Sequence, residues 1–408
     1  MPEQDLAVVI AGGPWQAPLI RFLKEKGHFV CVVDRSADLP GVRLADKHIN
    51  SDVLDEDNIF LQVKDLSPKF VVTDQSDLSV TVANNLSLRL GLRANPRESV
   101  DRFTNKYISR QFAPEAQMPT PRWHRIDSAG DLKTALADIG LPAILKPPDS
   151  QASCGVYKID SVNVKNAAEL MQKTLSYSKA GYILCEQYVE GTGLTIEGVC
   201  SAGKHRCVAV SQKDHFPSGV ISTLLYPAAI SDALLEQIFA AVDRYVARSG
   251  LQFGLTHTEV IVDTPGEKFW LVETACRGGG TRLSSDIAKW VSGIDLYEIL
   301  YKDLYNRPTD LASLSVIRRA AYLEFFEFGA GLVDHISGVE EARQLPGVFD
   351  LNLAFKQGDT INLAENGRTR QGYFIAMANT HAEVKDIAAR VYDTIKVRLN
   401  QPSQTLSR

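Results

Sequence analysis

The chain has 408 residues, a length that suggests two or three domains rather than one. Its composition, 45% hydrophobic and 23% charged, is that of a globular protein, and a net charge of −5 gives no reason to expect a nucleic-acid partner. No apolar stretch is long enough to span a bilayer, and the first residues do not form a secretory signal. Six scattered cysteines without metal-binding spacing favour a cytoplasmic protein with reduced thiols.

Residues 1–98 alternate apolar strands with amphipathic helices, which predicts a Rossmann-like parallel sheet with crossover helices. The expected elements are strands over 6–13, 28–34 and 69–75 and a helix over 17–27. The turn "AGGPWQ" and Asp34, which ends the second strand, form part of a dinucleotide-binding pattern. Because the third glycine is missing and a bulky Pro-Trp pair follows, a structural layer is favoured over an NAD site at Gly12 and Gly13.

The rest of the chain mixes helices and strands. Helices are expected over 99–113, 129–140, 231–250 (capped by Ser231) and about 382–399, and strands over 142–148, 194–200, 205–214, 320–328 and 372–378. The last helix places Val384, Ile387, Ala388, Val391 and Ile395 on one apolar face. A loop rich in Pro, Ser and Gly is expected over about 214–224, and the stretch 212–224 is a candidate gate over a site.

A predicted β-hairpin, "HTEVIVDTPGEKFWLVETACRGGG", carries one acid in each arm. The expected pairs are Asp263 with Phe269, Ile261 with Leu271, Glu259 with Glu273 and His257 with Ala275; the opposite, core-facing side carries Val260, Val262, Trp270 and Val272. Like charges that face each other destabilise a sheet, so a cation between Glu259 and Glu273 is expected, and Mg²⁺ fits. A solvent-facing pair or a slipped register are the alternatives.

Other residues could converge on phosphates beside such a metal. Arg277 follows Glu273 by four residues, and three glycines after it allow close approach of the backbone to a ligand. Lys146 ends an apolar strand and precedes the small-residue loop "DSQASCG", while Lys106 lies in a predicted helix. The extended stretch "ILCEQYVEG" is a candidate for adenine, with Glu186 on the exocyclic amine. Each of these features also has an ordinary structural explanation when taken alone.

In this order, the elements resemble the ATP-grasp superfamily over roughly residues 100–300, and the preceding layer resembles the domain before the grasp fold in biotin carboxylase and its relatives. The resemblance implies an α/β and α+β protein with three parts. These are a Rossmann-like domain at 1–98, a two-lobed ATP-grasp domain at 99–302 with its small lobe at about 119–186, and an α+β domain at 303–408 that completes the substrate site.

The resemblance also implies roles for individual residues. ATP would contact Lys106, Lys146, Ser153, Gly155, Glu186, Gln187, Tyr188, Val189 and Glu197; Glu259 and Glu273 would hold Mg²⁺, with Mn²⁺ as the alternative ion; Arg277 and Lys146 would be catalytic; His215, His257, Gly278 and Gly279 would be substrate candidates. Gly193 stands where many members have a ribose-binding glutamate, and Ala275 where many have a metal-binding asparagine.

The small residue before Arg277 is similar to amino-acid ligases that make dipeptides. The expected activity is therefore an ADP-forming ligase that activates a small carboxylate as an acyl phosphate and joins it to an amine. The alternatives are a carboxylase or carbamoyl-phosphate-type enzyme that phosphorylates bicarbonate, and a nucleotide-binding regulator without turnover. The expected partners are small molecules, with neither nucleic acid nor membrane, and a homodimer is the candidate assembly.

Overall fold

The computed structural model describes residues 4–151, 153–263, 265 and 268–400. The N-terminal part is a parallel sheet of order β3-β2-β1-β4. Its strands are β1 (Leu6–Ile10), β2 (Phe29–Asp34), β3 (Lys47–Asn50) and β4 (Phe70–Val72), and its helices are α1 (Ala17–Glu25), α2 (Glu56–Val63) and α3 (Asp77–Arg89). The parallel layer predicted for this part is confirmed, while β3 carries too few apolar residues to have been recognised.

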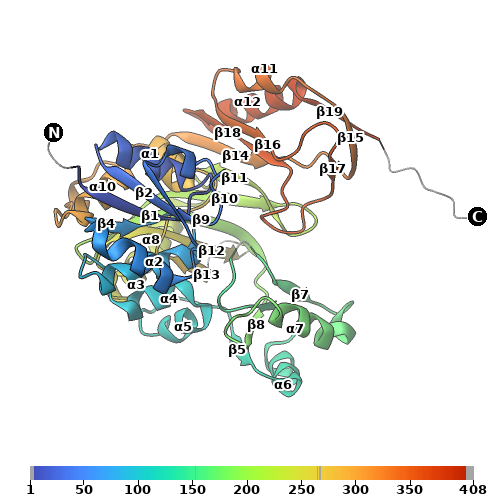
Figure 1. Cartoon of the computed structure of the whole chain (residues 1–408). Coiled ribbons are helices and arrows are strands. Elements are labelled where there is room, and N and C mark those ends of the chain that lie inside the picture. Colours follow the sequence, from blue (N-terminus) through green and yellow to red (C-terminus); the bar gives the residue numbers. More distant parts are fainter. Residues whose placement is uncertain (1–3, 152, 264, 266–267, 401–408) are drawn as a thin grey trace, which may run out of the picture.

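A small lobe lies away from the rest of the molecule, at the lower right of Figure 1. Its antiparallel sheet has the order β5-β8-β6-β7. The strands are β5 (Trp123–Ile126), β6 (Ala143–Lys146), β7 (Tyr157–Ile159) and β8 (Ile183–Gln187), and the helices are α6 (Ala129–Ile139) and α7 (Ala167–Leu175). One face of this sheet and both helices share a separate hydrophobic core.

An eight-stranded sheet of order β13-β12-β9-β10-β11-β14-β18-β16 runs through the middle of the molecule. It contains β9 (Gly191–Ser201), β10 (Lys204–His215), β11 (Ile221–Tyr226), β12 (Gly254–Asp263), β13 (Phe269–Ala275), β14 (Ala320–Phe325), β16 (Val348–Leu353) and β18 (Gly372–Ala378). The pairing of β11 with β14 joins strands of the last third directly to the strands of the central region. The side chains of both regions can therefore lie on one sheet face.

The remaining elements surround this sheet. They are α4 (Arg97–Thr104), α5 (Lys106–Phe112), α8 (Asp232–Arg248), α9 (Ala288–Ser292), α10 (Leu296–Leu304), α11 (Val339–Arg343) and α12 (His381–Thr394), with β15 (Gly331–Ser337), β17 (Thr360–Ile361) and β19 (Lys396–Asn400) in a third small sheet. One large core cluster spans the N-terminal sheet, the helices after the hairpin and one face of the eight-stranded sheet. Within the described part of the chain, no helix has the length and apolar character needed to cross a membrane.

Three predicted elements differ from the structure. The helix expected over 99–113 is two helices, because Asn105 leaves helical geometry and its side chain caps α5. The loop expected over 214–224 is a β-hairpin, since β10 continues to His215 and β11 begins at Ile221. The last helix ends at Thr394, and β19 then pairs with β15. The apolar face predicted for that helix is buried as expected.

Candidate active site

The hairpin formed by β12 and β13 brings the two acids opposite each other. Glu259 pairs with Glu273 and His257 with Ala275, as predicted. Beyond the acids the register shifts, so Val260 faces Leu271 and the predicted pairing of Ile261 with Leu271 is wrong. The same bulge overturns the pairing of Asp263 with Phe269. The predicted Thr-Pro-Gly-Glu turn lies largely outside the described residues.

The bulge changes which side chain enters the core and which backbone group is free. Leu271 is fully buried beside Val260, while Trp270 and Val272, which were predicted to face the core, are half-buried. The carbonyl of Val272 leaves the strand ladder and accepts hydrogen bonds from Arg110 (2.7 Å) and Lys146 (3.4 Å). The irregularity therefore turns a backbone acceptor toward cations on two other elements.

Each acid of the pair meets a lysine. Glu259 Oε2 lies 2.5 Å from Lys213 Nζ, and Glu273 Oε2 lies 3.1 Å from Lys106 Nζ. Lys213 on β10 reaches Glu259 because its neighbour across the ladder is Gly193: a Cβ at Gly193 would lie 2.7 Å from Lys213 Cε. The aliphatic part of the Lys213 side chain therefore occupies the space beside Gly193. This is the position for which the resemblance predicts the loss of a ribose-binding glutamate. The pairing of opposite charges explains how two facing carboxylates persist in one sheet.

A buried histidine stands beside Glu259. His257 Nδ1 lies 2.6 Å from Glu197 Oε1, and His257 Nε2 lies 3.6 Å from Glu259 Oε1. Burial alone would lower the pKa of His257, but the two carboxylates raise it to about 9. Its cross-strand neighbour is Ala275, the position of the missing asparagine. A protonated imidazole therefore supplies positive charge beside the acid pair.

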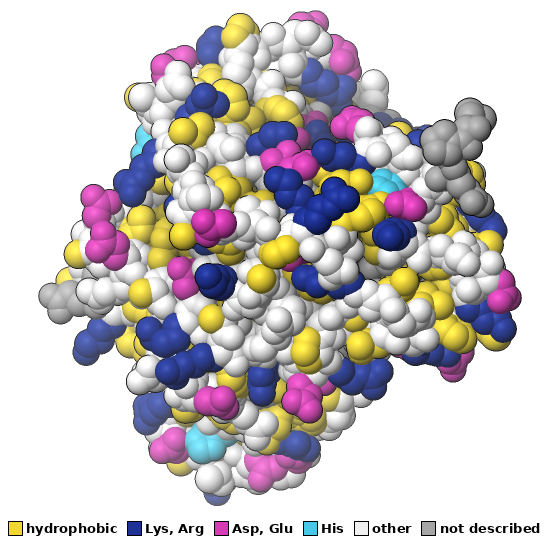
Figure 2. Space-filling model, turned by 90° about the vertical axis from the view of Figure 1, so that its left-hand side faces the viewer, with side chains coloured by type: hydrophobic (Ala, Val, Ile, Leu, Met, Phe, Trp, Pro, Cys, Tyr) yellow, Lys and Arg dark blue, Asp and Glu magenta, His cyan; other side chains and the backbone are white. Residues whose placement is uncertain are grey.

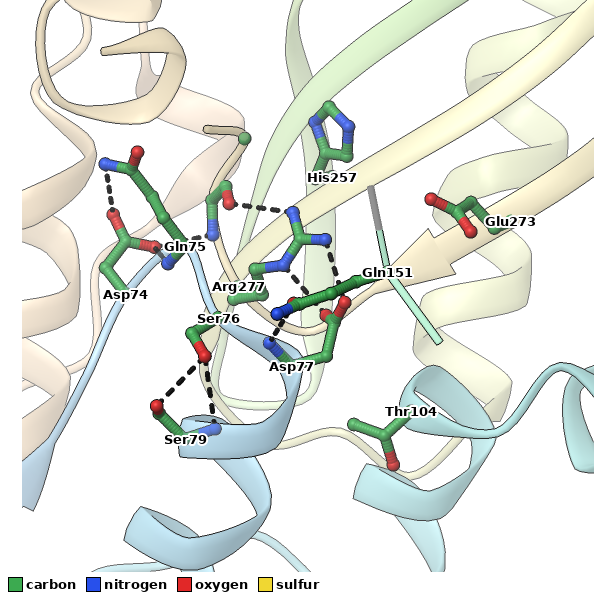
Figure 3. Close-up of polar contacts among 12 residues, drawn as sticks. Asp74, Gln75, Ser76, Asp77, Ser79, Thr104, Gln151, His257, Glu273 and Arg277 are labelled. Carbon is green, nitrogen blue, oxygen red and sulfur yellow. Dashed lines mark hydrogen bonds and ion pairs between the residues drawn. The ribbon is translucent and has the colours of Figure 1, made fainter. Parts of the chain in front are cut away.

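Arg277 is held by an acid from the N-terminal part of the chain. Its Nε and Nη2 atoms donate to the two carboxylate oxygens of Asp77 at 2.8 and 3.0 Å, and Nη1 donates to the carbonyl of Gly278 at 3.0 Å (Figure 3). Asp77 opens helix α3, and its backbone N–H donates to the side chain of Gln151. Burial would raise the pKa of Asp77, but Arg277 holds it below its usual value.

The glycines after Arg277 bind protein carboxylates. The N–H of Gly278 donates to Asp74 Oδ1 at 2.7 Å, and the N–H of Gly279 donates to Glu197 Oε2 at 3.0 Å. A Cβ at Gly278 would lie 2.2 Å from the Ser284 side chain, so the close approach expected of these glycines is to protein atoms. Asp74 thereby fastens the N-terminal sheet to the segment that carries Arg277.

Lys146 forms part of a buried charged group in the small lobe. Its Nζ lies 2.7 Å from Glu186 Oε2, and Arg110 donates to both oxygens of Glu186 at 2.9 and 3.0 Å. Burial is the main reason that the pKa of Lys146 falls to about 8, although Glu186 opposes the shift. The Glu186 carboxylate is buried and pairs with two cations, and its predicted contact with an adenine amine stays a prediction.

The other predicted nucleotide residues surround the same region. The N–H of Gln187 donates to Arg122 and that of Tyr188 to Pro142, and Val189 follows in the connection to β9. In the loop 149–155, Ser153 and Gly155 both have positive φ, 59° and 74°. A Cβ at Gly155 would lie 2.8 Å from Tyr177, so packing and backbone geometry both require glycine there. Lys106 Nζ donates to the carbonyl of Ser150 at 2.6 Å, which brings this loop to the hairpin.

The glycine turn after β1 is not arranged as a dinucleotide loop. The N–H of Gly12 donates to Asp34 Oδ2 at 3.0 Å, so the acid considered for a ribose binds this turn instead. A Cβ at Gly12 would lie 2.4 Å from Val42, which shows that protein side chains fill the space at the turn. These contacts support the structural explanation of the turn.

Comparison with known proteins identifies the arrangement. A family model described as an ATP-grasp domain matches residues 139–285, and one described as L-amino acid ligase C-terminal domain 2 matches residues 324–400. The chain therefore contains an ATP-grasp domain at residues 139–285. The predicted fold class and the ligase assignment are thereby confirmed.

Individual relatives agree with this ATP-grasp assignment. The L-amino acid ligase of Bacillus licheniformis superposes with a TM-score of 0.82 at 18% identity, covering 98% of this chain and 100% of that one, a likeness that shows the fold alone. The formate-dependent phosphoribosylglycinamide formyltransferase of Stenotrophomonas maltophilia is 25% identical over 98% of this chain and 97% of its own length. The alanine–anticapsin ligase of Bacillus amyloliquefaciens is 24% identical over 62% of this chain, which spans only 57% of that relative.

The two hairpin acids of this ATP-grasp chain are suited to a divalent metal. They offer carboxylate oxygens from opposed positions on neighbouring strands, which is the donor chemistry that Mg²⁺ prefers. The amines of Lys106 and Lys213 show that this place already attracts positive charge. Glu259 and Glu273 would hold the ion, and phosphate and water oxygens would complete its coordination.

Several residues of the site were not found from the sequence. Asp74, Asp77, Arg110, Lys213 and Arg370 carry contacts described here or below, yet none lies in a recognisable motif. The acids Asp74 and Asp77 did carry a weak signal, because they directly follow a buried parallel strand, where such sheets place their ligands. His215, a predicted substrate residue, lies exposed at the end of β10, where the register shifts.

The face of the molecule shown in Figure 2 bears acidic and basic side chains next to one another. No broad surface of a single charge covers this face, in agreement with the net charge of −5.

Proposed function

We propose that this protein is a magnesium- and ATP-dependent ligase that joins a small carboxylate, most suitably an amino acid, to an amine and releases ADP and phosphate. The observation that carries the proposal is the convergence of Glu259, Glu273, Lys106 and Arg277 around one hairpin. Such a site can receive a triphosphate and its metal on one side and an acid to be phosphorylated on the other.

The contacts of Arg277 fix its position and leave some of its N–H donors free. An arginine has five N–H donors, and Asp77 and Gly278 together take three of them. One donor on each terminal nitrogen is left for a phosphoryl oxygen. The paired carboxylate fixes the plane of the guanidinium, so that the charge of Arg277 is already oriented toward a transferring phosphoryl group.

The lysines and acids have the remaining roles in binding phosphate and metal. Lys106 and Lys146 would neutralise phosphate oxygens, and the contact of Lys106 with the Ser150 carbonyl would bring the small-lobe loop over them. A bound Mg²⁺ would supply positive charge to the β- and γ-phosphates. Glu197 stays fully buried and orients His257, which keeps positive charge next to Glu259.

The chemistry proceeds in two balanced steps. An oxygen of the substrate carboxylate attacks the γ-phosphorus, the bond to the β-phosphate oxygen breaks, and ADP leaves. The amine nitrogen of the second substrate then attacks the acyl carbon, the bond to the phosphate oxygen breaks, and the nitrogen gives up a proton. Water must be excluded between the steps because it would hydrolyse the acyl phosphate.

A screen of amino acids in pairs tests the proposal. Purified protein with ATP and Mg²⁺ is expected to release ADP only with a suitable pair, and mass spectrometry of the product should show one amide bond. Release of ADP with bicarbonate alone would favour the carboxylase alternative. Binding of ATP without ADP release for any acid would favour the regulator.

One relative supports a second candidate acid. The match to a formate-dependent formyltransferase covers 98% of this chain, whereas the match to the alanine–anticapsin ligase of Bacillus amyloliquefaciens covers 62%. Formate therefore belongs in the screen as a carboxylate donor with each amine. The domain boundaries, the cytoplasmic location and the homodimer stay predictions.

A further inference from the structure

One arginine near the site has no ion-pair partner in the described part of the chain. Among the residues that the structure describes, Arg370 forms neither a hydrogen bond from its side chain nor an ion pair, and its buried Nε has no partner. The other described arginines with a buried unpartnered nitrogen each meet an acid; they are Arg93, Arg110, Arg282 and Arg390. A guanidinium that is largely out of water without an acid is costly unless an anion from outside joins it.

The contacts around Arg370 hold it in a defined position. Its guanidinium lies over the ring of Phe325, with 3.6 Å from Cζ to the ring centroid. The next residue, Gln371, is buried and its amide bonds to the backbone of two segments: it accepts from Phe328 at 2.6 Å and donates to Gly329 at 2.6 Å and Asn362 at 2.8 Å. The backbone that carries Arg370 is thereby fixed in place.

Arg370 lies just before β18 and packs on Phe325, a residue of the sheet that also carries the hairpin acids. Phe325 is paired with Tyr373, and one ladder leads from β14 through β11 to Lys213, the partner of Glu259. Burial lowers the pKa of Arg370 to about 10, while the Glu259 carboxylate acts in the opposite direction. Arg370 is therefore close enough to Glu259 to feel its charge, yet the acid is bonded to Lys213 rather than to Arg370.

The wall beside Arg370 joins distant parts of the chain. The ring of Tyr373 packs against Phe325 on one side and against Trp15 on the other, with centroid separations of 6.5 and 5.8 Å. Trp15 belongs to the glycine turn after β1, which no nucleotide role explains. Asp350, an acid beside this wall, accepts a hydrogen bond from the hydroxyl of Tyr373 and pairs with Arg282. Arg370 thus keeps its charge for a ligand.

We propose that Arg370 binds the acidic group of the second substrate, so that the amine accepted by this enzyme carries an oxyanion, as a free amino acid does. The inference rests on the proposed function. The first substrate presents its carboxylate to the phosphoryl group beside Arg277, and a simple amino acid then has no second anion for Arg370. The attacking amine does have one, and a guanidinium can bind a carboxylate or phosphonate oxygen pair with two donors.

The test compares acceptors in the wild type, in Arg370→Gln and in a matched control, Arg368→Gln, whose exposed side chain lies two residues earlier in the same segment. The acceptors are the amino acid chosen by the pair screen, its carboxamide, its phosphonic acid analogue and hydroxylamine. Hydroxylamine is neutral and traps the acyl phosphate as a hydroxamate, so it reports the first step without needing Arg370.

In Arg370→Gln, the KM for the amino-acid acceptor is expected to rise on the order of 10- to 100-fold. Hydroxamate formation and the KM for ATP should stay at wild-type values, and the Arg368 variant should behave as wild type throughout. The wild type should also discriminate against the carboxamide, and Arg370→Gln should lose that discrimination. Use of the phosphonate by the wild type would extend the site to phosphate-bearing amines.

Two results separate failure of this inference from failure of the proposed function. If the wild type forms hydroxamate but Arg370→Gln keeps the wild-type KM for the amino acid, the ligase stands and the role of Arg370 is overturned. If the wild type forms neither hydroxamate nor amide with any acid, the ligase itself falls, and the acceptor site falls with it.

Discussion

Asp77 and Arg277 lie 200 residues apart in the chain and form a two-bond pair between the start of helix α3 and the segment after the β12–β13 hairpin. The pair leaves two guanidinium donors free and sets their direction. The first residue of helix α3 therefore orients the arginine for which we propose a role in phosphoryl transfer.

Arg277→Ala should separate stability from activity. The change leaves the Asp77 carboxylate buried without its partner, and the free energy of unfolding is expected to fall by about 3 kcal/mol. ADP release should fall more strongly than ATP affinity, because the lost charge acts on the transferring group. Urea unfolding and steady-state kinetics measure the two effects.

The double variant Asp77→Asn with Arg277→Ala provides the control for that experiment. Removing the unpaired acid should restore most of the lost stability, while ADP release stays low. Recovery of activity together with stability would show that Arg277 only supports the fold.

Glu273→Gln tests the metal assignment. The change keeps the size of the side chain but removes one carboxylate from the hairpin pair, and ADP release is expected to fall by roughly 100-fold or more. Thermal unfolding should stay close to that of the wild type. Glu236→Gln, an exposed position on α8, is the matched control. Wild-type turnover at all magnesium concentrations would remove Glu273 from the site.

The pKa of Lys146 predicts how ATP binding changes with pH. Because burial lowers this pKa to about 8, the ammonium is lost as pH rises through that value, and the KM for ATP should increase. Lys146→Arg keeps its charge and should flatten the rise. Lys133→Arg, exposed on the helix α6 of the same lobe, should keep the wild-type profile. A pH-independent KM in the wild type would contradict the role of Lys146 at the phosphates.

The raised pKa of His257 predicts a loss of stability at alkaline pH. Its value rises from 6.5 to about 9 on folding, so the folded state binds the proton more tightly. The stabilisation is fully present below pH 6.5 and is lost as pH rises through 9, and it amounts to about 3 kcal/mol. Urea unfolding of the wild type and of His257→Gln across this window measures it. Parallel curves for the two proteins would rule out the charged His257.

The hairpin shows which structural features can be predicted from the sequence and which cannot. The even separation between Glu259 and Glu273 predicted that they share one side of the hairpin, because side chains alternate along strands, and the structure pairs them. The bulge after Glu259 left no local signal, since it depends on what the freed carbonyl of Val272 meets. The same limit applied to α5, where the capping side chain of Asn105 outweighed a continuous helical pattern.

By itself the sequence determined many of the strands and helices, the shared side of the two acids and the arginine that follows them, because these features depend on spacing within one segment. Only the tertiary structure decided that Asp77 holds Arg277, that Lys213 takes the space beside Gly193, and that Arg370 packs on Phe325 without an ion pair among the described residues. These contacts join segments that become neighbours only when the sheets pack. The burial that strengthens the interactions between their charges exists only in the folded protein.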